Sequence, residues 1–305
     1  MNKLKITIEE TIDYLSSRLA VDSLNRDPYW PKWDSPWWRI LLLFEIGQGH
    51  LVPRSIAEQL VEKINTHYLH FFPFCEDEIP KDKDPYRHIL CHCALGSVYK
   101  FFRSYFSDID SMIPWARAWF IKYQLPDGGL NCDEQAYTKS KKSSVTSSLP
   151  ALEAILSCAS TGLTENEILF LDKGAEYLIK HKLVYSLSGK IMDDNFLKLQ
   201  FPRFYSYDIL RGISFLVEWR RFRNKSDANE VIEFGYNIIA QKFPDKILKI
   251  EKSEFNKYKT LLLSDSNEWV WGNARTFPLL DDLSKSGIES KYLSEEFVRI
   301  QSHIR

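Results

Sequence analysis

The sequence lacks the features that mark membrane-spanning and secreted proteins. Its longest apolar runs, such as residues 40–44, are far shorter than the roughly 20 residues that a membrane-spanning helix needs. Cysteine is scarce, and five residues at irregular spacing are not typical of a disulfide framework. The N-terminal segment has no apolar stretch before its acidic residues, so it is not predicted to be a signal peptide. These features predict a cytoplasmic protein with reduced thiols and no transmembrane segment.

Blocks of basic residues are also missing. The chain has 40 basic and 41 acidic residues, a formal net charge of −1, and this balance argues against a nucleic-acid or anionic-membrane partner. Glycine is scarce too, with 12 residues, whereas aromatic residues reach 14% and include nine tryptophans. With 44% apolar residues over 305 positions, the chain is long enough for a large core. We predict a single domain over residues 1–305.

Helical patterns dominate the chain. Capping boxes are predicted at Thr7 and Thr164, where each hydroxyl is followed three residues later by a glutamate. Ser294 is predicted to begin the last helix, and no sustained period-two alternation predicts a strand. Residues 183–203 form the one irregular stretch. The pattern predicts an all-α protein.

Five segments repeat along the chain at loose intervals. Each begins with a loop rich in proline, glycine, aspartate and aromatic residues, and continues into a more apolar helix. The segments, marked by Trp37, His92, Ser147, Tyr207 and Arg275, follow one another at intervals of 55 to 68 residues. One helical hairpin fits such a period. We therefore predict an α/α toroid of about five to six helical hairpins around a central cavity.

One stretch of the chain is similar to a known family. Residues 115–132, WARAWFIKYQLPDGGLNC, resemble the Gln-x-x-Asp-Gly-Gly repeat of squalene cyclases and protein prenyltransferases. Residues 27–38, 91–96 and 201–212 look like segments of bacterial prenyltransferase-like and squalene cyclase-like proteins. The resemblance covers roughly residues 27–220. It implies the α/α toroid and a hydrophobic or isoprenoid-type small molecule in the central cavity.

The catalytic motifs of these families are incomplete in this chain. The nearest approach to the Asp-x-Asp-Asp acid of class II cyclases, at residues 108–111, ends in serine. The nearest approach to the Asp-Asp-x-x-Asp magnesium motif, at residues 281–285, ends in lysine. Cys132 and Asp133 stand where a zinc site would begin, but serines and a threonine replace the expected histidine. The resemblance therefore implies the fold more strongly than the activity.

Two groups of residues are candidates for a metal or a general base. His88 and His92 are four residues apart in a predicted helix, one turn after Asp84, a spacing that suits a divalent metal such as zinc or a base oriented by a carboxylate. Cys132 and Asp133, directly after the glycine turn, are candidates for a further ligand and an acid. The alternative for each is structural: a satisfied core histidine, and a turn that needs its glycines. Cys91 and Cys93 are predicted to be small buried hydrophobic residues.

The segment before Gly212 supplies the other candidates. Asp208 is predicted either to pair with Arg211, three residues on, or to act as a general acid in a dry cavity. Arg203, Tyr205 and Tyr207 are candidates for binding the substrate at the same mouth. Both readings of Asp208 stay open at this point.

Tryptophans are concentrated near the first repeat. Trp37 and Trp38 are predicted either to line the cavity, where indole faces stabilise cations or stack on a ligand, or to plug the ring with large apolar area. The plug is the more common fate of tryptophan. As substrate-binding candidates they stand beside Arg203, Tyr205 and Tyr207.

Three functions follow as hypotheses. The first is a prenyltransferase-like or terpenoid cyclase-like protein that binds or transforms an isoprenoid-type ligand. The second is a carbohydrate-active toroid, in which Asp133 and Asp208 would be the carboxylate pair, about 5–9.5 Å apart. The third is a non-catalytic ligand-binding or scaffold protein that has kept the ring without the chemistry.

Overall fold

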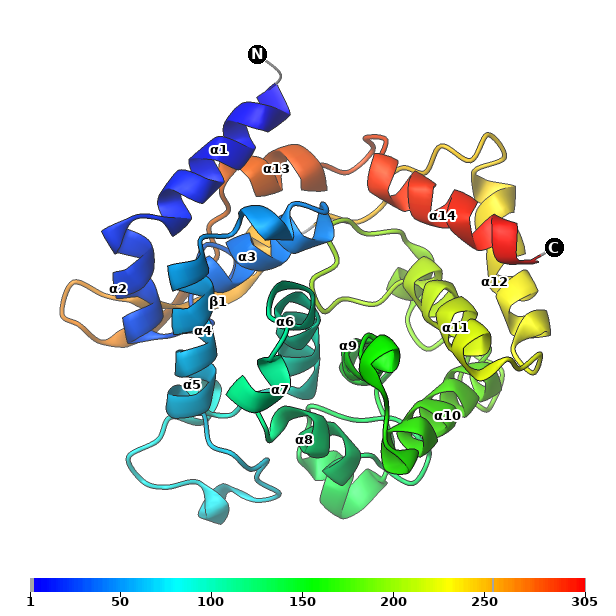
Figure 1. Ribbon diagram of the computed structural model, residues 1–305, viewed down its shortest axis with the longest axis horizontal. Helices are drawn as coiled ribbons and strands as arrows, with labels where there is room; N and C mark the ends of the chain where they lie inside the picture. The colour runs from blue at the N-terminus through cyan, green and yellow to red at the C-terminus, as the bar shows by residue number, and fades with distance from the viewer. Residues whose placement is uncertain (1–2, 254, 305) are drawn as a thin grey trace. The chain divides into compact units, whose positions relative to one another are not determined.

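Helices make up 58% of the residues that the computed structural model describes, which are residues 3–253 and 255–304 (Figure 1). The described residues contain fourteen α-helices, several short 3-10 turns, one π turn and a single two-stranded sheet. This content confirms the prediction of an all-α protein. None of the described helices is long and apolar enough to cross a membrane.

The chain divides into two compact units. Unit 1 contains residues 3–90, 101–115 and 255–284, and unit 2 contains residues 91–100, 116–253 and 285–304. The elements of unit 1 are α1 (Lys3–Leu15), α2 (Arg18–Arg26), α3 (Pro36–Glu45), η1 (Gly49–Leu51), α4 (Arg54–His67), η2 (Glu76–Glu78), α5 (Pro85–His88), α7 (Ile109–Met112), η6 (Phe255–Lys257), β1 (Lys259–Leu263), β2 (Trp269–Asn273) and α13 (Pro278–Ser284).

Unit 2 is helical apart from isolated bridges. Its elements are α8 (Ala116–Lys122), η3 (Ala136–Ser140), α9 (Val145–Leu156), η4 (Ala159–Thr161), α10 (Glu165–Lys180), η5 (Asp194–Leu197), α11 (Ile209–Arg223), α12 (Asn229–Lys242) and α14 (Lys291–Ile304). Helix α6 (His92–Tyr105) begins in unit 2 and ends in unit 1.

Helix α9 forms the centre of unit 2. Nine of its twelve residues are buried, and it packs against α10 and α11, which flank it in Figure 1. Gly96 of α6 lets that helix approach closely, because a Cβ there would lie 2.4 Å from the backbone carbon of Pro150 in α9. Helix α11 in turn packs against α12 and α14. The apolar helices α3, α6, α9 and α11 are all buried over most of their length, as predicted from their composition.

Three predictions about helix boundaries have different outcomes. The Thr164 capping box is confirmed, since its hydroxyl accepts from the Glu167 N–H and the Glu167 carboxylate accepts from the Thr164 N–H. The box at Thr7 is wrong, because Thr7 lies inside α1 and its hydroxyl donates to Leu4 O. The prediction that Ser294 begins the last helix is also wrong, because Ser294 lies inside α14. The residue before this helix, Ser290, caps its start, and its hydroxyl accepts from the Leu293 N–H.

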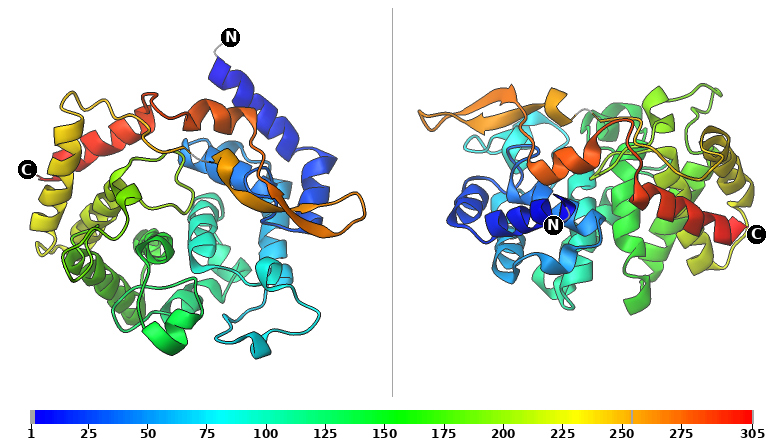
Figure 2. Two further views of the ribbon diagram at one scale, coloured as in Figure 1. Left: turned by 180° about the vertical axis from the view of Figure 1, so that it is seen from behind. Right: turned by 90° about the horizontal axis from the view of Figure 1, so that it is seen from above.

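The last quarter of unit 1 differs from the prediction. Residues 259–273 form an antiparallel hairpin, in which Lys259 pairs with Asn273 and Leu263 with Trp269 (Figure 2). The predicted fifth apolar helix is reduced to the seven residues of α13, which packs against α1. Three consecutive leucines in β1 do not alternate with polar residues, so period-two patterning could not predict this strand.

Candidate functional site

The glycine turn of residues 127–129 positions the candidate site in unit 2. The Gln124 amide, just after α8, donates to Gly128 O (2.8 Å) and to Phe170 O of α10 (2.9 Å). The Asp127 carboxylate accepts from the N–H of Ser143 (2.8 Å) and from its hydroxyl. These contacts tie the turn to α10 and to the segment that leads into α9.

Both glycines are required by close packing. Gly128 has a φ of +103°, and a Cβ on it would lie 2.3 Å from Lys173 O of α10. A Cβ on Gly129 would lie 2.5 Å from the Ser148 hydroxyl, which accepts the Leu130 N–H (2.7 Å). The chain therefore leaves the turn in one fixed direction, toward Cys132.

Three cysteines meet next to this turn, and we call Cys91, Cys93 and Cys132 the thiol cluster. The Cys132 sulfur lies 3.6 Å from that of Cys93, which is in the first turn of α6. The Cys132 N–H donates to the Ser147 hydroxyl of α9 (3.1 Å). All three cysteines are half-buried, so the prediction that Cys91 and Cys93 are buried hydrophobic residues is only partly met.

Hydrogen bonding within the thiol cluster shifts the pKa values of Cys132 and Cys93 in opposite directions. The thiols of Cys91 and Cys93 hold the pKa of Cys132 well below its usual value, because their hydrogen bonds stabilise its thiolate. The same contact with Cys132, reinforced by one with Cys91, raises the pKa of the Cys93 thiol. The Cys132 thiol therefore forms its thiolate more readily than the Cys93 thiol does.

His92 is fully buried beside the cluster. Its Nδ1 accepts a hydrogen bond from the Trp119 indole (2.8 Å), and its Nε2 lies 3.1 Å from the Tyr137 hydroxyl. An indole N–H only donates, so Nε2 carries the proton of the neutral ring and donates to Tyr137. The Tyr137 hydroxyl donates onward to Tyr123 O (3.0 Å). Burial lowers the pKa of His92 to about 4. A neutral ring with both nitrogens engaged positions its neighbours and has no lone pair for a substrate.

The predicted helix that would align His88 with His92 is absent. Helix α5 ends at His88, residues 89–91 leave the helical path, and α6 begins at His92, so the two histidines do not share a helix face. His88 stacks on His67 at 4.6 Å between ring centroids, and burial lowers its pKa. The Asp84 carboxylate accepts the Tyr86 N–H (2.9 Å) as the cap of α5.

The predicted zinc site does not fit this arrangement. Among the described residues, no group of three or more histidine, cysteine, aspartate or glutamate side chains is placed to hold a metal ion. His88, His92 and Cys132 therefore do not form a ligand set here. Asp133 is exposed, and its carboxylate accepts the N–H of Gln135 (2.9 Å) as part of its own turn.

Asp208 is a fully buried helix cap. Its carboxylate accepts from the N–H of Arg211 (2.9 Å), the N–H of Gln200 (3.2 Å) and the guanidinium of Arg203 (2.8 Å). The predicted side-chain pair with Arg211 is wrong, because the Arg211 guanidinium binds Glu153 instead. A carboxylate filled by three internal donors is not poised to protonate a ligand.

The other predicted binding residues hold the fold together. Arg203 also donates to Glu296 of α14 (2.7 Å), and the buried Tyr207 hydroxyl donates to Leu183 O (3.0 Å), while Tyr205 is half-buried.

In unit 1, Trp37 and Trp38 are 0% exposed, and Trp38 packs on Trp33 at 4.5 Å between ring centroids. This placement favours the plug over the cavity wall.

One partly buried cluster of charged side chains was not predicted from the sequence. Glu153 of α9 accepts from Arg211 of α11 (2.7 Å) and from Lys100 of α6 (2.8 Å). Burial raises the pKa of Glu153, but the charges of Arg211 and Lys100 outweigh it and hold the pKa far below its usual value. A single glutamate within the apolar run of residues 149–156 was the available signal.

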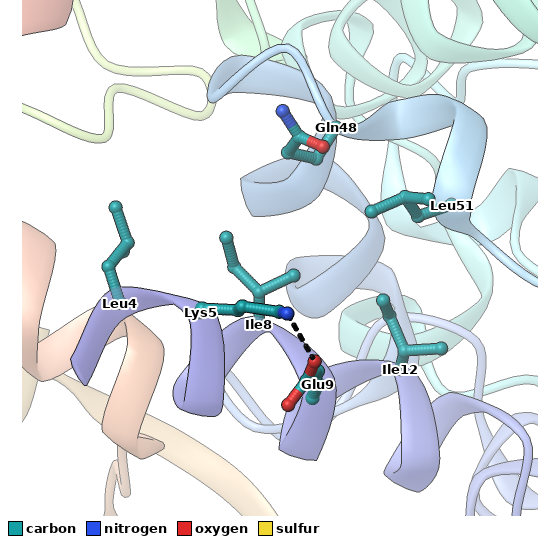
Figure 3. Close-up of a pocket in the computed structure, with 7 residues that line it drawn as sticks. All are labelled: Leu4, Lys5, Ile8, Glu9, Ile12, Gln48 and Leu51. Carbon is teal, nitrogen blue, oxygen red and sulfur yellow. Dashed lines mark ion pairs between the residues drawn. The ribbon is translucent and has the colours of Figure 1, made fainter. Parts of the chain in front are cut away.

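A groove of about 500 Å³ lies in unit 1, and none of its residues was among the predicted site residues. Figure 3 shows the α1 side chains on one side and those of the η1 segment on the other, with an ion pair between Lys5 and Glu9. Its lining residues are Leu4, Lys5, Ile8, Glu9, Ile12, Gln48 and Leu51.

Comparisons with protein-family models, with curated proteins and with solved structures found no match.

Proposed function

We propose that this chain is a helical-repeat protein of the prenyltransferase-like and squalene cyclase-like kind, which binds a hydrophobic, isoprenoid-type ligand. The observation that carries the proposal is the turn from Gln124 to Gly129. Its glutamine and aspartate make hydrogen bonds, and its two glycines allow close backbone approach, so that the turn links α8, α10 and the segment that leads into α9. The same motif carries the resemblance to families that act on isoprenoids.

We further propose that the helices close into an α/α toroid, with α3, α6, α9 and α11 as its inner helices. Two observations support this arrangement. The four helices are buried, apolar and spaced along the chain by one hairpin period. Between them, α4 and α10 each present one apolar stripe, as outer helices of a repeat do.

Binding without turnover is the form of this function that the site supports best. The predicted base, His92, and the predicted acid, Asp208, are both engaged in internal hydrogen bonds. The carbohydrate-active alternative is weakened by the same fact, because Asp208 would be one of its two carboxylates. The non-catalytic ligand-binding alternative is therefore part of the proposal.

The test is ligand retention in native mass spectrometry. Protein prepared without detergent is incubated with farnesol, with dodecanol as a straight-chain control, and with maltotetraose. We expect one farnesol per chain, less dodecanol, and a higher unfolding temperature with farnesol alone. Incubation with farnesyl diphosphate should release no inorganic diphosphate.

Each other result contradicts a stated part of the proposal. Stabilisation by maltotetraose and not by farnesol would favour the carbohydrate-active alternative. Equal retention of farnesol and dodecanol would remove the isoprenoid specificity. Release of diphosphate would show catalysis in place of binding. Gly128→Ala should lose farnesol below its own unfolding temperature, whereas Gly189→Ala, where a Cβ meets open space, should keep it.

A further inference from the structure

We propose that Cys132 and Cys93 form a reversible redox site, in which a peroxide converts the two thiols into a disulfide. This goes beyond the proposed ligand binding and does not depend on it. The first observation is distance: the two sulfurs are 3.6 Å apart although the residues are 39 positions apart in sequence. A disulfide bond is about 2.0 Å long, so the sulfurs need to approach by about 1.6 Å.

The second observation is how the two sulfurs are held. Cys93 is fixed in the first turn of α6, whose backbone is bonded onward, as in the contact from the Ser97 hydroxyl to Cys93 O (2.9 Å). Cys132 lies in a short irregular segment between the Leu130–Ser144 bridge and η3. The loop sulfur therefore moves toward the helix sulfur, and the helix keeps its hydrogen bonds.

The third observation is access combined with local polarity. Cys132 and Cys93 each keep part of their surface exposed, whereas Cys158 is fully buried with its thiol on Ala154 O. Cys91 and Ser147 both hydrogen-bond Cys132, which favours its thiolate as the attacking group. Cys75 is exposed and lies outside the thiol cluster.

The reaction balances in two steps. The Cys132 thiolate attacks one oxygen of hydrogen peroxide, forms a sulfenic acid and releases hydroxide, which takes a proton to become water. The Cys93 sulfur then attacks the Cys132 sulfur, the S–O bond breaks, and a second water leaves as the disulfide forms. Two electrons pass from the two thiols to the peroxide. A dithiol reductant reverses the change by taking the disulfide back to two thiols.

The experiment counts thiols in the full chain carrying Cys75→Ala, so that intermolecular disulfides do not interfere. Four of the five cysteines remain in this parent. A short treatment with hydrogen peroxide should lower the thiol count from four to two, lower the intact mass by about 2 Da, and join tryptic peptides 88–100 and 123–139. Dithiothreitol should restore all four thiols.

Variants on this parent assign the pair. Cys93→Ala and Cys132→Ala should each abolish the loss of two thiols, and Cys93→Ala should leave a sulfenic acid on Cys132 that dimedone traps. Cys158→Ala, at a buried position outside the thiol cluster, is the matched control and should still form the disulfide. The proposal is overturned if the parent forms no intramolecular disulfide, or if Cys91→Ala abolishes it while Cys93→Ala does not. Circular dichroism checks that each variant is folded, and all samples are free of isoprenoid, so a failure to bind farnesol leaves this result unaffected.

Discussion

The buried imidazole of His92 makes folding depend on pH in a defined window. Its pKa is about 4 in the folded chain, against about 6.5 for an unperturbed histidine. The unfolded state therefore binds more protons between these two values, and stability rises with pH there. As pH falls from about 6.5 to 4, the folded state loses up to about 3 kcal/mol through this one ring.

We expect His92→Gln to flatten that dependence. A glutamine side chain can accept from Trp119 and donate to Tyr137 without gaining a proton, so the free energy of unfolding should change less between pH 7 and pH 4.5. Urea unfolding at several pH values measures the slope. His50→Gln, at an exposed position, is the control and should keep the slope of the unchanged chain. Equal slopes in all three proteins would show that His92 is not the titrating group.

At the residue scale, the sequence indicated which side chains matter chemically, but it did not predict their hydrogen-bond and ion-pair partners. Asp208 and Arg211 were predicted to pair with each other through their side chains, yet each side chain forms its ion pair with a different residue. Asp208 binds Arg203 and two backbone amides, and Arg211 binds Glu153, 58 positions away. Local spacing cannot predict such contacts, because they are set by how helices pack.

At the element scale, the glycine turn is the most demanding local structure. Gly128→Ala would place a methyl group 2.3 Å from Lys173 O, at a φ of +103°. Both backbone strain and the clash oppose it, and we expect a loss of about 3 kcal/mol or more. Gly189 also has a positive φ, +79°, but a Cβ there meets no atom within 4 Å. Gly189→Ala should therefore cost only about 1–2 kcal/mol. Thermal unfolding measures the loss of stability in both variants. Similar losses would mean that the backbone of the glycine turn adjusts to the methyl group without strain.

The charge cluster at Glu153 links three helices of unit 2. Glu153→Gln would leave the buried Arg211 guanidinium without its carboxylate, and removing one partner of a buried pair costs about 3–5 kcal/mol. Asp22→Asn is the control, because its partner Arg18 is largely exposed, and it should change stability by less than about 0.5 kcal/mol. Denaturant unfolding compares the two. A small effect of Glu153→Gln would indicate that water solvates the charges of Arg211 and Lys100 once the carboxylate is gone.

Helix boundaries were predicted correctly where a capping pattern and an apolar helix face occurred together. The Thr164 box has a helix behind it with a clear apolar face, and its cap is confirmed. The Thr7 segment has the same Thr-x-x-Glu pattern, but the helix already begins at Lys3, so Thr7 lies inside it. The hairpin of residues 259–273 was not predicted, because its strands are five residues each and show no alternation. Tertiary contacts decide such short segments.

At the scale of the whole molecule, α6 is the element that both units share. Its first nine residues belong to unit 2 and its last five to unit 1. Val98 and Tyr99 are buried in the former part, and Phe101 and Phe102 in the latter. A single domain was predicted from length and composition, which cannot locate a division that runs through a helix. We infer that a helix with core residues in both units couples their unfolding.

The tryptophans provide a direct test of that coupling. Seven of the nine, at positions 30, 33, 37, 38, 115, 269 and 271, lie in unit 1, so their fluorescence reports mainly on that unit. Far-UV circular dichroism reports on helices of both units. We expect the two probes to give one coincident unfolding transition, and Glu153→Gln, which acts in unit 2, to shift both equally.

Breaking α6 at the junction should separate the two signals. Ser104 is exposed, and Ser104→Pro removes the N–H that bonds back to residue 100 without deleting a core side chain. The fluorescence and dichroism midpoints should then move apart. Glu233→Pro is the matched control, because it breaks the exposed face of α12 within unit 2 and leaves α6 continuous. If the unchanged chain already shows two midpoints, the units unfold independently, and continuity of α6 does not couple them.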